Sequence, residues 1–63
     1  MEKYKVIDIY DGRDTLGYTS NMNTVKKLAR ERSADTDGEC AIEIRELNPE
    51  TNKYKFMKML ETC

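Results

Sequence analysis

Apolar and polar residues alternate in four short segments of the chain, and this two-residue period is typical of β-strands. The four segments are residues 3–10, 15–19, 40–47 and 54–60. Turn-forming residues separate them, with Asp11 and Gly12 after the first segment and Asn48 and Pro49 after the third. The pattern therefore predicts two β-hairpins, one near each end of the chain.

Between the hairpins, residues 25–34 have the composition of a helix. They follow the run 20–24, whose Ser, Asn and Thr side chains can cap the free amides of a first helical turn. At about 100° per residue, one stripe of this helix is apolar. The stripe consists of Met22, Val25, Leu28 and Ala29. Gly38 suits the left-handed conformation that often ends a helix.

Charge and apolar content predict the register of the second hairpin. With residues 49–52 as a four-residue loop, Asn52 takes the left-handed conformation that closes the turn. The predicted pairs are then Leu47 with Tyr54, Glu46 with Lys55, Arg45 with Phe56, Ile44 with Met57, Glu43 with Lys58, Ile42 with Met59 and Ala41 with Leu60. In the first hairpin, a loop of residues 11–14 pairs Ile9 with Leu16 and Ile7 with Tyr18.

These elements predict a single α+β domain over residues 1–63, ordered β-hairpin, helix, β-hairpin. A right-handed crossover gives a four-stranded antiparallel sheet with strand order 2-1-3-4. The single helix can cover only one face of this sheet. The residues predicted to face the helix are Ile7, Ile9, Leu16, Tyr18, Cys40, Ile42, Ile44, Met57 and Met59.

The opposite face of the predicted sheet is unusually apolar for a face in water. It collects Tyr4, Val6, Tyr10, Ala41, Arg45, Leu47, Tyr54, Phe56 and Leu60, with Asp8, Glu43 and Lys58 among them. Tyr and Arg concentrate binding energy at interfaces, so this face predicts binding of another protein or a second copy of the chain. The residues predicted to bind are Tyr4, Val6, Tyr10, Arg45, Tyr54 and Phe56. The alternative is that the small sheet curls until its aromatic residues cover one another.

The net charge of −1 and a pI near 5.4 mean that no overall positive field attracts nucleic acid. The basic side of the helix nevertheless supports an alternative function as a small nucleic-acid-binding regulator. Its phosphate-contacting residues would be Lys26, Lys27 and Arg30. Arg32 falls within the apolar arc, where we expect its stem to pack while its charged head reaches water.

The sequence lacks the residues that most catalytic and metal sites need. It holds no His and two Cys, so it offers neither a zinc ligand set nor a base for a nucleophilic thiol. It has no glycine-rich phosphate loop, and so short a chain does not easily enclose a ligand pocket. We therefore expect no enzyme activity, cofactor, metal or small-molecule substrate.

Location is predicted from the apolar runs and the cysteines. No apolar run approaches the roughly 20 residues that span a bilayer, and we expect no signal peptide. Cys40 and Cys63 are predicted to be free thiols in a reducing cytoplasm, with a disulfide between them as the alternative. Cys40 is further predicted to be a small core residue at the start of the third strand.

The order of elements, the helix start Thr19-Ser20-Asn21 and the loop of residues 48–52 resemble small accessory proteins of bacterial phages and mobile elements. The resemblance covers the whole chain. Inhibitors of host defence, anti-CRISPR proteins included, are compact single domains of this kind that act by binding. The resemblance therefore implies a non-enzymatic protein-binding module, and it assigns no role to any particular residue.

Overall fold

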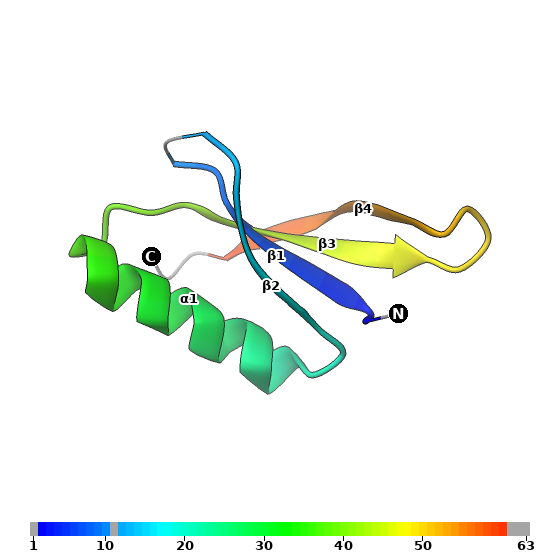
Figure 1. Cartoon of the computed structure of the whole chain (residues 1–63), viewed down its shortest axis with the longest axis horizontal. Helices are drawn as coiled ribbons and strands as arrows, with labels where there is room; N and C mark the ends of the chain where they lie inside the picture. Colours follow the sequence, from blue (N-terminus) through cyan, green and yellow to red (C-terminus); the bar gives the residue numbers. More distant parts are fainter. Residues whose placement is uncertain (1, 11, 61–63) are drawn as a thin grey trace.

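The computed structural model describes residues 2–10 and 12–60, in which four strands and one helix follow in the predicted order. The strands are β1 (Tyr4–Asp8), β2 (Asp14–Thr19), β3 (Ile42–Asn48) and β4 (Lys53–Leu60), and the helix is α1 (Met22–Thr36) (Figure 1). The predicted turn residue Asp11 and the predicted thiol of Cys63 lie outside the described residues.

The strands form one antiparallel sheet in the order β2-β1-β3-β4, which confirms the predicted topology. Strands β1 and β3 are central, and each hairpin adds one edge strand. Figure 1 shows α1 beneath one end of the sheet, while the β3–β4 hairpin extends beyond the helix. The molecule is therefore elongated, with extents of 38 × 23 × 16 Å.

Local side-chain chemistry sets the ends of the helix and of the second hairpin. Asn21 caps α1, and its side-chain oxygen accepts a hydrogen bond of 2.8 Å from the amide of Asn23. At the other end, Asp37 (φ 53°) and Gly38 (φ 82°) are both left-handed. Asn52 is left-handed as well (φ 58°) and closes the β3–β4 turn, as its sequence position predicts.

The core lies between α1 and one face of the sheet. Its buried cluster is Tyr4, Val6, Val25, Ala29, Cys40, Ile42 and Ile44, with Leu16, Met22, Leu28 and Leu60 packed against it. All four residues of the predicted apolar stripe of the helix belong to this set, which confirms the stripe. Each fully buried Val or Ile side chain contributes about 1.5–3 kcal/mol through burial, so this layer holds α1 on the sheet.

The predicted faces of β1 are wrong. Tyr4 and Val6 lie in the core under α1, whereas Ile7 points to the opposite face of the sheet. Successive side chains of a strand point to opposite faces, so one residue determines the orientation of all the others. Asp8 is that residue, because its carboxylate binds Arg32 of α1 and must therefore lie on the helix side.

A β-bulge in the first hairpin shifts the register of β1 against β2. Lys5 pairs with Tyr18 and Ile7 with Thr15, so Leu16 is the extra residue between them. The predicted pairs of Ile7 with Tyr18 and of Ile9 with Leu16 are therefore wrong. Leu16 nevertheless reaches the core, as predicted.

A second bulge interrupts the β3–β4 pairing. The predicted pairs from Asn48–Lys53 to Arg45–Phe56 are confirmed, but Ile44 pairs with Lys58, which leaves Met57 as the extra residue. The predicted pairs of Ile44, Glu43, Ile42 and Ala41 with β4 are wrong, because every later residue of β4 is displaced by one. Leu60 consequently packs on the core and Met59 lies on the opposite face, the reverse of the prediction.

Cys40 lies in the core cluster just before β3, as predicted. It is disulfide-bonded, so the prediction that it carries a free thiol is wrong. Small domains bury little apolar surface, and a covalent cross-link is one of the ways in which they compensate. The free thiols were expected from a reducing cytoplasm, which was itself predicted from the lack of a signal peptide and of a membrane span, and the cytoplasmic location stays a prediction.

Candidate functional site

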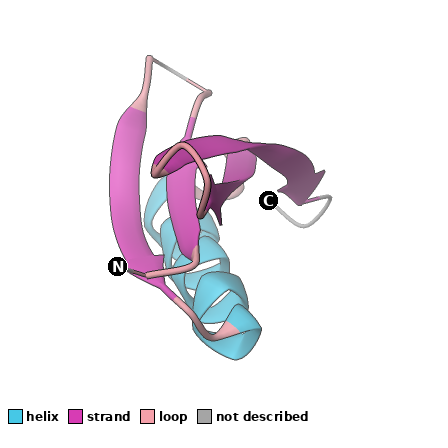
Figure 2. Ribbon diagram, turned by 90° about the vertical axis from the view of Figure 1, so that its right-hand side faces the viewer, coloured by secondary structure: helices cyan, strands magenta, loops and turns pink. Residues whose placement is uncertain are grey.

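The sheet face turned away from α1, here called the outer face, carries both apolar and charged side chains. Figure 2 shows α1 on one side of the strands, and the described residues place no helix on the other side. Strand alternation and the cross-strand pairs assign to the outer face Lys5, Ile7, Tyr18, Glu43, Arg45, Leu47, Tyr54, Phe56 and Met59.

At one end of the outer face, a buried carboxylate is held by two arginines. Glu43 lies 3.5 Å from Arg13 Nη2 and 3.2 Å from Arg45 Nη2, and its side chain is only 7% exposed. Arg13 precedes β2 while Glu43 is on β3, so this ion pair joins the segments that flank β1. Ile7 of β1 lies beside Glu43 and is 2% exposed, so both the carboxylate and its apolar neighbour are shielded from water.

Two tyrosines meet across the outer face from opposite edge strands. The rings of Tyr18 (β2) and Tyr54 (β4) are 5.5 Å apart between centroids, and Tyr54 Oη donates a hydrogen bond of 2.6 Å to the carbonyl of Glu2. Partial burial raises the pKa of the Tyr54 hydroxyl, and the nearby Tyr18 and Glu2 raise it further. The aromatic residues therefore cover part of the face themselves, as the alternative from sequence predicts.

The rest of the outer face remains exposed around Phe56. Its ring is 57% exposed although it lies at the middle of β4, and Met59 on the same strand is 40% exposed. Arg45 lies directly opposite Phe56 on β3 and has one guanidinium nitrogen, Nε, that is buried without a hydrogen-bond partner among the described residues. An apolar patch with a cation at its border is the usual composition of a protein-binding surface.

The structure brings together only half of the six residues predicted to bind a partner. Arg45, Tyr54 and Phe56 share the outer face, whereas Tyr4 and Val6 lie in the core on the other side of the sheet. Tyr10 is 60% exposed but lines a depression near the end of α1. The sequence prediction missed Tyr18 and Met59. Tyr18 was placed under the helix together with Ile7 because the faces of β1 were reversed, and Met59 because of the wrong register of β4.

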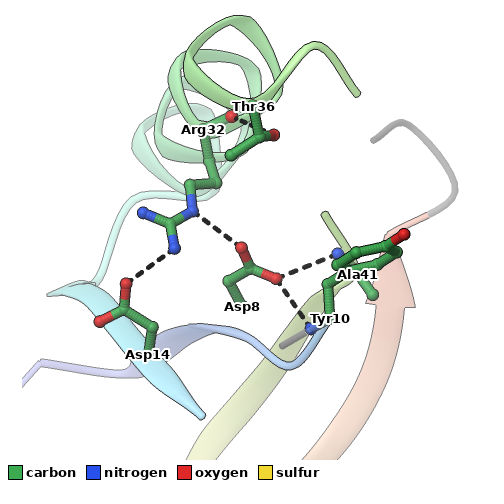
Figure 3. Close-up of polar contacts among 6 residues, drawn as sticks. All are labelled: Asp8, Tyr10, Asp14, Arg32, Thr36 and Ala41. Atoms are coloured by element: carbon green, nitrogen blue, oxygen red, sulfur yellow. Dashed lines mark hydrogen bonds and ion pairs between the residues drawn. The ribbon is translucent and has the colours of Figure 1, made fainter. Parts of the chain in front are cut away.

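A polar cluster joins α1 to the sheet on the helix side (Figure 3). Arg32 Nε lies 2.8 Å from Asp8 Oδ2, and Arg32 Nη2 lies 2.8 Å from Asp14 Oδ2. The other oxygen of Asp8 accepts hydrogen bonds from the amides of Tyr10 (3.0 Å) and Ala41 (3.1 Å). Arg32 therefore joins the first hairpin to the helix. Its side chain is 30% exposed, so its charged head reaches the surface as predicted, but it is paired there with Asp8 and Asp14.

The protonation of Asp8 follows from these contacts. Burial by itself would raise its pKa, but the hydrogen bonds from the Tyr10 amide, Arg32 and the Ala41 amide together hold the pKa below its usual value. Asp8 correspondingly raises the pKa of the Arg32 guanidinium. The pair is ionised on both sides, so neither group is poised to exchange protons near neutral pH.

A depression of about 310 Å³ adjoins this cluster and is lined by Asp8, Tyr10, Arg32, Thr36 and Glu39. Its volume reaches the lower end of the range for ligand pockets. The short length of the chain had led us to expect no such pocket. Thr36 Oγ1 donates to the carbonyl of Arg32, and the charged groups of Asp8 and Arg32 bind each other. The polar groups around the depression therefore bind one another, as in a structural junction between α1 and the first hairpin.

Comparison with known proteins finds no matching family model, no similar curated protein and no similar solved structure. The described residues contain no cluster of potential metal ligands. The one helix among residues 2–10 and 12–60 is too short and too polar to cross a membrane. The geometry of the surfaces is therefore the basis for a proposal.

The predicted phosphate-contacting residues lie on the solvent side of α1. Lys26, Lys27 and Arg30 are all exposed, and none forms an ion pair in the part of the chain that the structure describes. Glu31 is exposed next to them, however, and the overall charge is −1. Three cations with this acidic neighbour form a weaker positive surface than most nucleic-acid-binding helices present.

Proposed function

We propose that the chain is a non-enzymatic protein-binding module that acts through the outer face and associates with itself. The observation that carries the proposal is the 57% exposure of Phe56 in the middle of a sheet face that no described helix covers. Arg45 lies opposite it, with one guanidinium nitrogen paired to Glu43 and another, Nε, that is buried without a hydrogen-bond partner among the described residues. Aromatic and Arg side chains of this kind are enriched among the residues that dominate binding.

Self-association is part of the proposal because the same face is apolar on every copy. Tyr18 and Tyr54 pack on each other and cover part of the face, so a second copy would pack chiefly on Phe56, Met59 and Leu47. A symmetric pairing of two such faces brings each Phe56 into an apolar environment. Burial of the ring in this way removes the exposed apolar area that a monomer presents.

The test compares two aromatic residues that are exposed to the same degree. Phe56→Asp places a charge on the outer face, whereas Tyr10→Asp (60% exposed in the native chain) places it near the end of α1. Light-scattering mass should show a dimer for the native chain and for Tyr10→Asp, and a monomer for Phe56→Asp. Circular dichroism checks that each variant is folded.

Two results would contradict the proposal. If Phe56→Asp keeps the native mass and still captures, in a pull-down, the proteins that the native chain captures, the outer face is not an interface. If Phe56→Asp unfolds the domain, the ring is part of the core and the face has been assigned wrongly.

The biological role that we propose with it is inhibition of a host defence complex, the role that the resemblance to phage accessory proteins implies. Binding to a surface of such a complex requires no catalytic group. A reconstituted defence complex that loses activity on addition of the native chain, and keeps it with Phe56→Asp, would support this role.

The second candidate function is nucleic-acid binding through the helix, which the exposure of Lys26, Lys27 and Arg30 favours. Binding by these residues should weaken steeply as salt is raised, because phosphate contacts release counterions. A Lys27→Ala/Arg30→Ala variant should then retard DNA less than the native chain at low salt. Absence of any retardation by the native chain would exclude this function.

A further inference from the structure

The open edge of β4 is a second surface, distinct from the outer face. Among the described residues β4 pairs only with β3, so one row of its backbone amides and carbonyls has no strand beside it. The strand runs for eight residues, and Figure 1 shows that its hairpin extends past the end of α1. A strand of this length with a free edge can pair with another chain.

The bulge at Met57 sorts the side chains of β4 into two rows. Lys53, Lys55 and Lys58 pair with Asn48, Glu46 and Ile44, so all three lysines lie on the helix-side row. Tyr54, Phe56 and Met59 lie on the outer row. Without the extra residue, Lys58 would fall on the apolar row, so the bulge keeps charge and apolar surface apart.

Among the described residues, no acidic side chain forms an ion pair with the lysine row. β4 contains three Lys and no Asp or Glu, and the ion pairs of the described residues use none of these lysines. Glu46 lies opposite Lys55 as predicted, but its ion pair is with Lys3; Glu43 does not lie opposite Lys58, and its ion pairs are with Arg13 and Arg45. The positive charge along this edge is therefore available to an acidic partner.

A second copy of β4 is a poor occupant of this edge. In the antiparallel register that overlaps the whole strand, Lys53 lies opposite Leu60 of the copy, and Lys55 lies opposite its Lys58. Like charges placed directly opposite each other are destabilising. Edge lysines are also one of the devices by which natural sheets prevent pairing with their own copies.

The outer row offers apolar contacts to the same occupant. Phe56 and Met59 of this row and the bulge residue Met57 are all exposed. A depression of about 320 Å³ lies beside Phe56 and Met57, and its lining is both apolar (Leu47, Pro49) and polar (Glu46, Asn48, Lys55). An apolar side chain from a strand added at this edge would lie next to these residues. The chemistry of β4 therefore fits a strand with carboxylates on one side and apolar residues on the other.

We propose that the free edge of β4 binds an extended acidic segment of a partner protein as a fifth strand of the sheet. Backbone hydrogen bonds provide the pairing, Lys53, Lys55 and Lys58 face its carboxylates, and the outer row faces its apolar residues. This inference names the kind of partner for the protein-binding function proposed above and rests on it in that respect. The backbone edge and the lysine row lie outside the self-associating face, whereas Phe56 and Met59 of the outer row belong to both.

The probe is a fluorescein-labelled peptide of alternating Glu and Val with the eight-residue length of β4. Fluorescence polarisation should show binding to the native chain, and much weaker binding of a scrambled peptide of the same composition. Lys55→Glu/Lys58→Glu should weaken binding at least about tenfold, because two attractions become repulsions. A peptide of alternating Lys and Val should bind this variant better than the native chain does.

The matched control is Lys26→Glu/Lys27→Glu, which makes the same charge change on α1 and should leave peptide affinity within about twofold. If both variants weaken binding equally, the peptide responds to net charge and the proposal is overturned. Failure of the Glu/Val peptide to bind the native chain overturns it as well.

Backbone methylation separates strand addition from attraction between charges. Successive amides of a strand point to opposite sides, so methylating the Glu amides and methylating the Val amides block opposite edges of the peptide. One of the two methylated peptides should bind like the parent and the other should not bind. Equal binding of both would show that no fifth strand forms, and would overturn the proposal.

Light-scattering mass separates this inference from the function proposed for the outer face. A dimer that is lost in Phe56→Asp and kept in Lys55→Glu/Lys58→Glu, with a peptide that fails to bind, leaves the outer face standing and removes the edge site. If the peptide binds as described and Phe56→Asp keeps the native mass, the edge site stands and the outer face is removed as an interface. A native dimer that the peptide dissociates would assign the edge to a second copy and overturn the inference.

Discussion

Replacing Asp8 with Ala removes the carboxylate on which three segments of the fold converge. Its oxygens accept hydrogen bonds from the amide of Tyr10 at 3.0 Å, from the amide of Ala41 at 3.1 Å and from Arg32 Nε at 2.8 Å. These donors come from the end of β1, the approach to β3 and the helix. The substitution therefore loosens the junction between the hairpins and α1 without touching the apolar core.

The size of the loss in unfolding free energy follows from the two backbone amides of Tyr10 and Ala41. Each loses its acceptor in a partly buried position, which costs about 1–1.5 kcal/mol, so the free energy of unfolding should fall by about 2–3 kcal/mol. The ion pair adds nothing to this figure, because Arg32 keeps its contact with Asp14. A domain of 63 residues has a total stability of about 3–9 kcal/mol, so the loss is a large fraction of it.

Urea unfolding followed by circular dichroism measures the effect, with Asp8→Asn as the control. The Asn side chain keeps an oxygen that both amides can use, so Asp8→Asn should lose less than half of what Asp8→Ala loses. A loss below about 0.5 kcal/mol for Asp8→Ala, or equal losses for the two variants, would refute the role given to the amides.

Three further results are expected. The pKa of Asp8 in the folded state is below its usual value, so ionised Asp8 stabilises the fold. This stability is complete above the usual pKa and is lost as the pH falls through the folded-state pKa. Thermal unfolding between about pH 5 and pH 2 should show the loss, and the loss should be smaller in Asp8→Asn. Ile44→Ala, at a fully buried site, should cost about 3 kcal/mol in denaturant unfolding, whereas Met59→Ala should cost less than about 1 kcal/mol, and similar costs would contradict the assigned faces. Gly17→Ala brings a Cβ to 3.2 Å from Leu28 Cδ1 and should cost about 1 kcal/mol, an effect that a Leu28→Ala background should largely remove.

The elements and their order could be predicted because each has a local signal. Asn21 caps the helix through its own side chain, and Asn52 adopts the left-handed conformation that the turn requires. The register next to that turn is correct for the same reason, since a loop of known length determines the first pairs of a hairpin. Strand order 2-1-3-4 then follows from the handedness of the crossover.

The faces of β1 could not be predicted from apolar content alone, because both sides of this strand are apolar. Val6 on one side and Ile7 on the other are both buried, one under α1 and the other beside Glu43. One signal was present but unused: Arg32 lies in the apolar arc of the helix and needs an acid across from it. Pairing it with Asp8 would have placed Val6 correctly.

The candidate site was only half predicted because bulges have no clear signature in this sequence. The bulge in β4 displaces the residues beyond it by one position, which changes the face of Met59. Tyr18 shares a face with Ile7 in the prediction and in the structure alike, so its error comes from the reversed faces of β1. Arg45 and Phe56 lie between the turn and the second bulge, and their pair is correct. On β4, errors in the outer face therefore begin where the pairing stops being regular.

Met57, the extra residue in β4, also determines which single-residue deletion the strand can tolerate. A deletion that removes Met57 alone would close the strand into regular pairing, with Phe56 still opposite Arg45 and Lys58 still opposite Ile44. Deleting Lys55 instead would also allow regular pairing, but Phe56 would then lie opposite Glu46 on the helix-side row and Met57 would take its place opposite Arg45. Relatives that lack only the residue at Met57 should therefore still fold. Among relatives that are shorter by one residue in β4, loss of a neighbouring residue should be much rarer than loss of Met57.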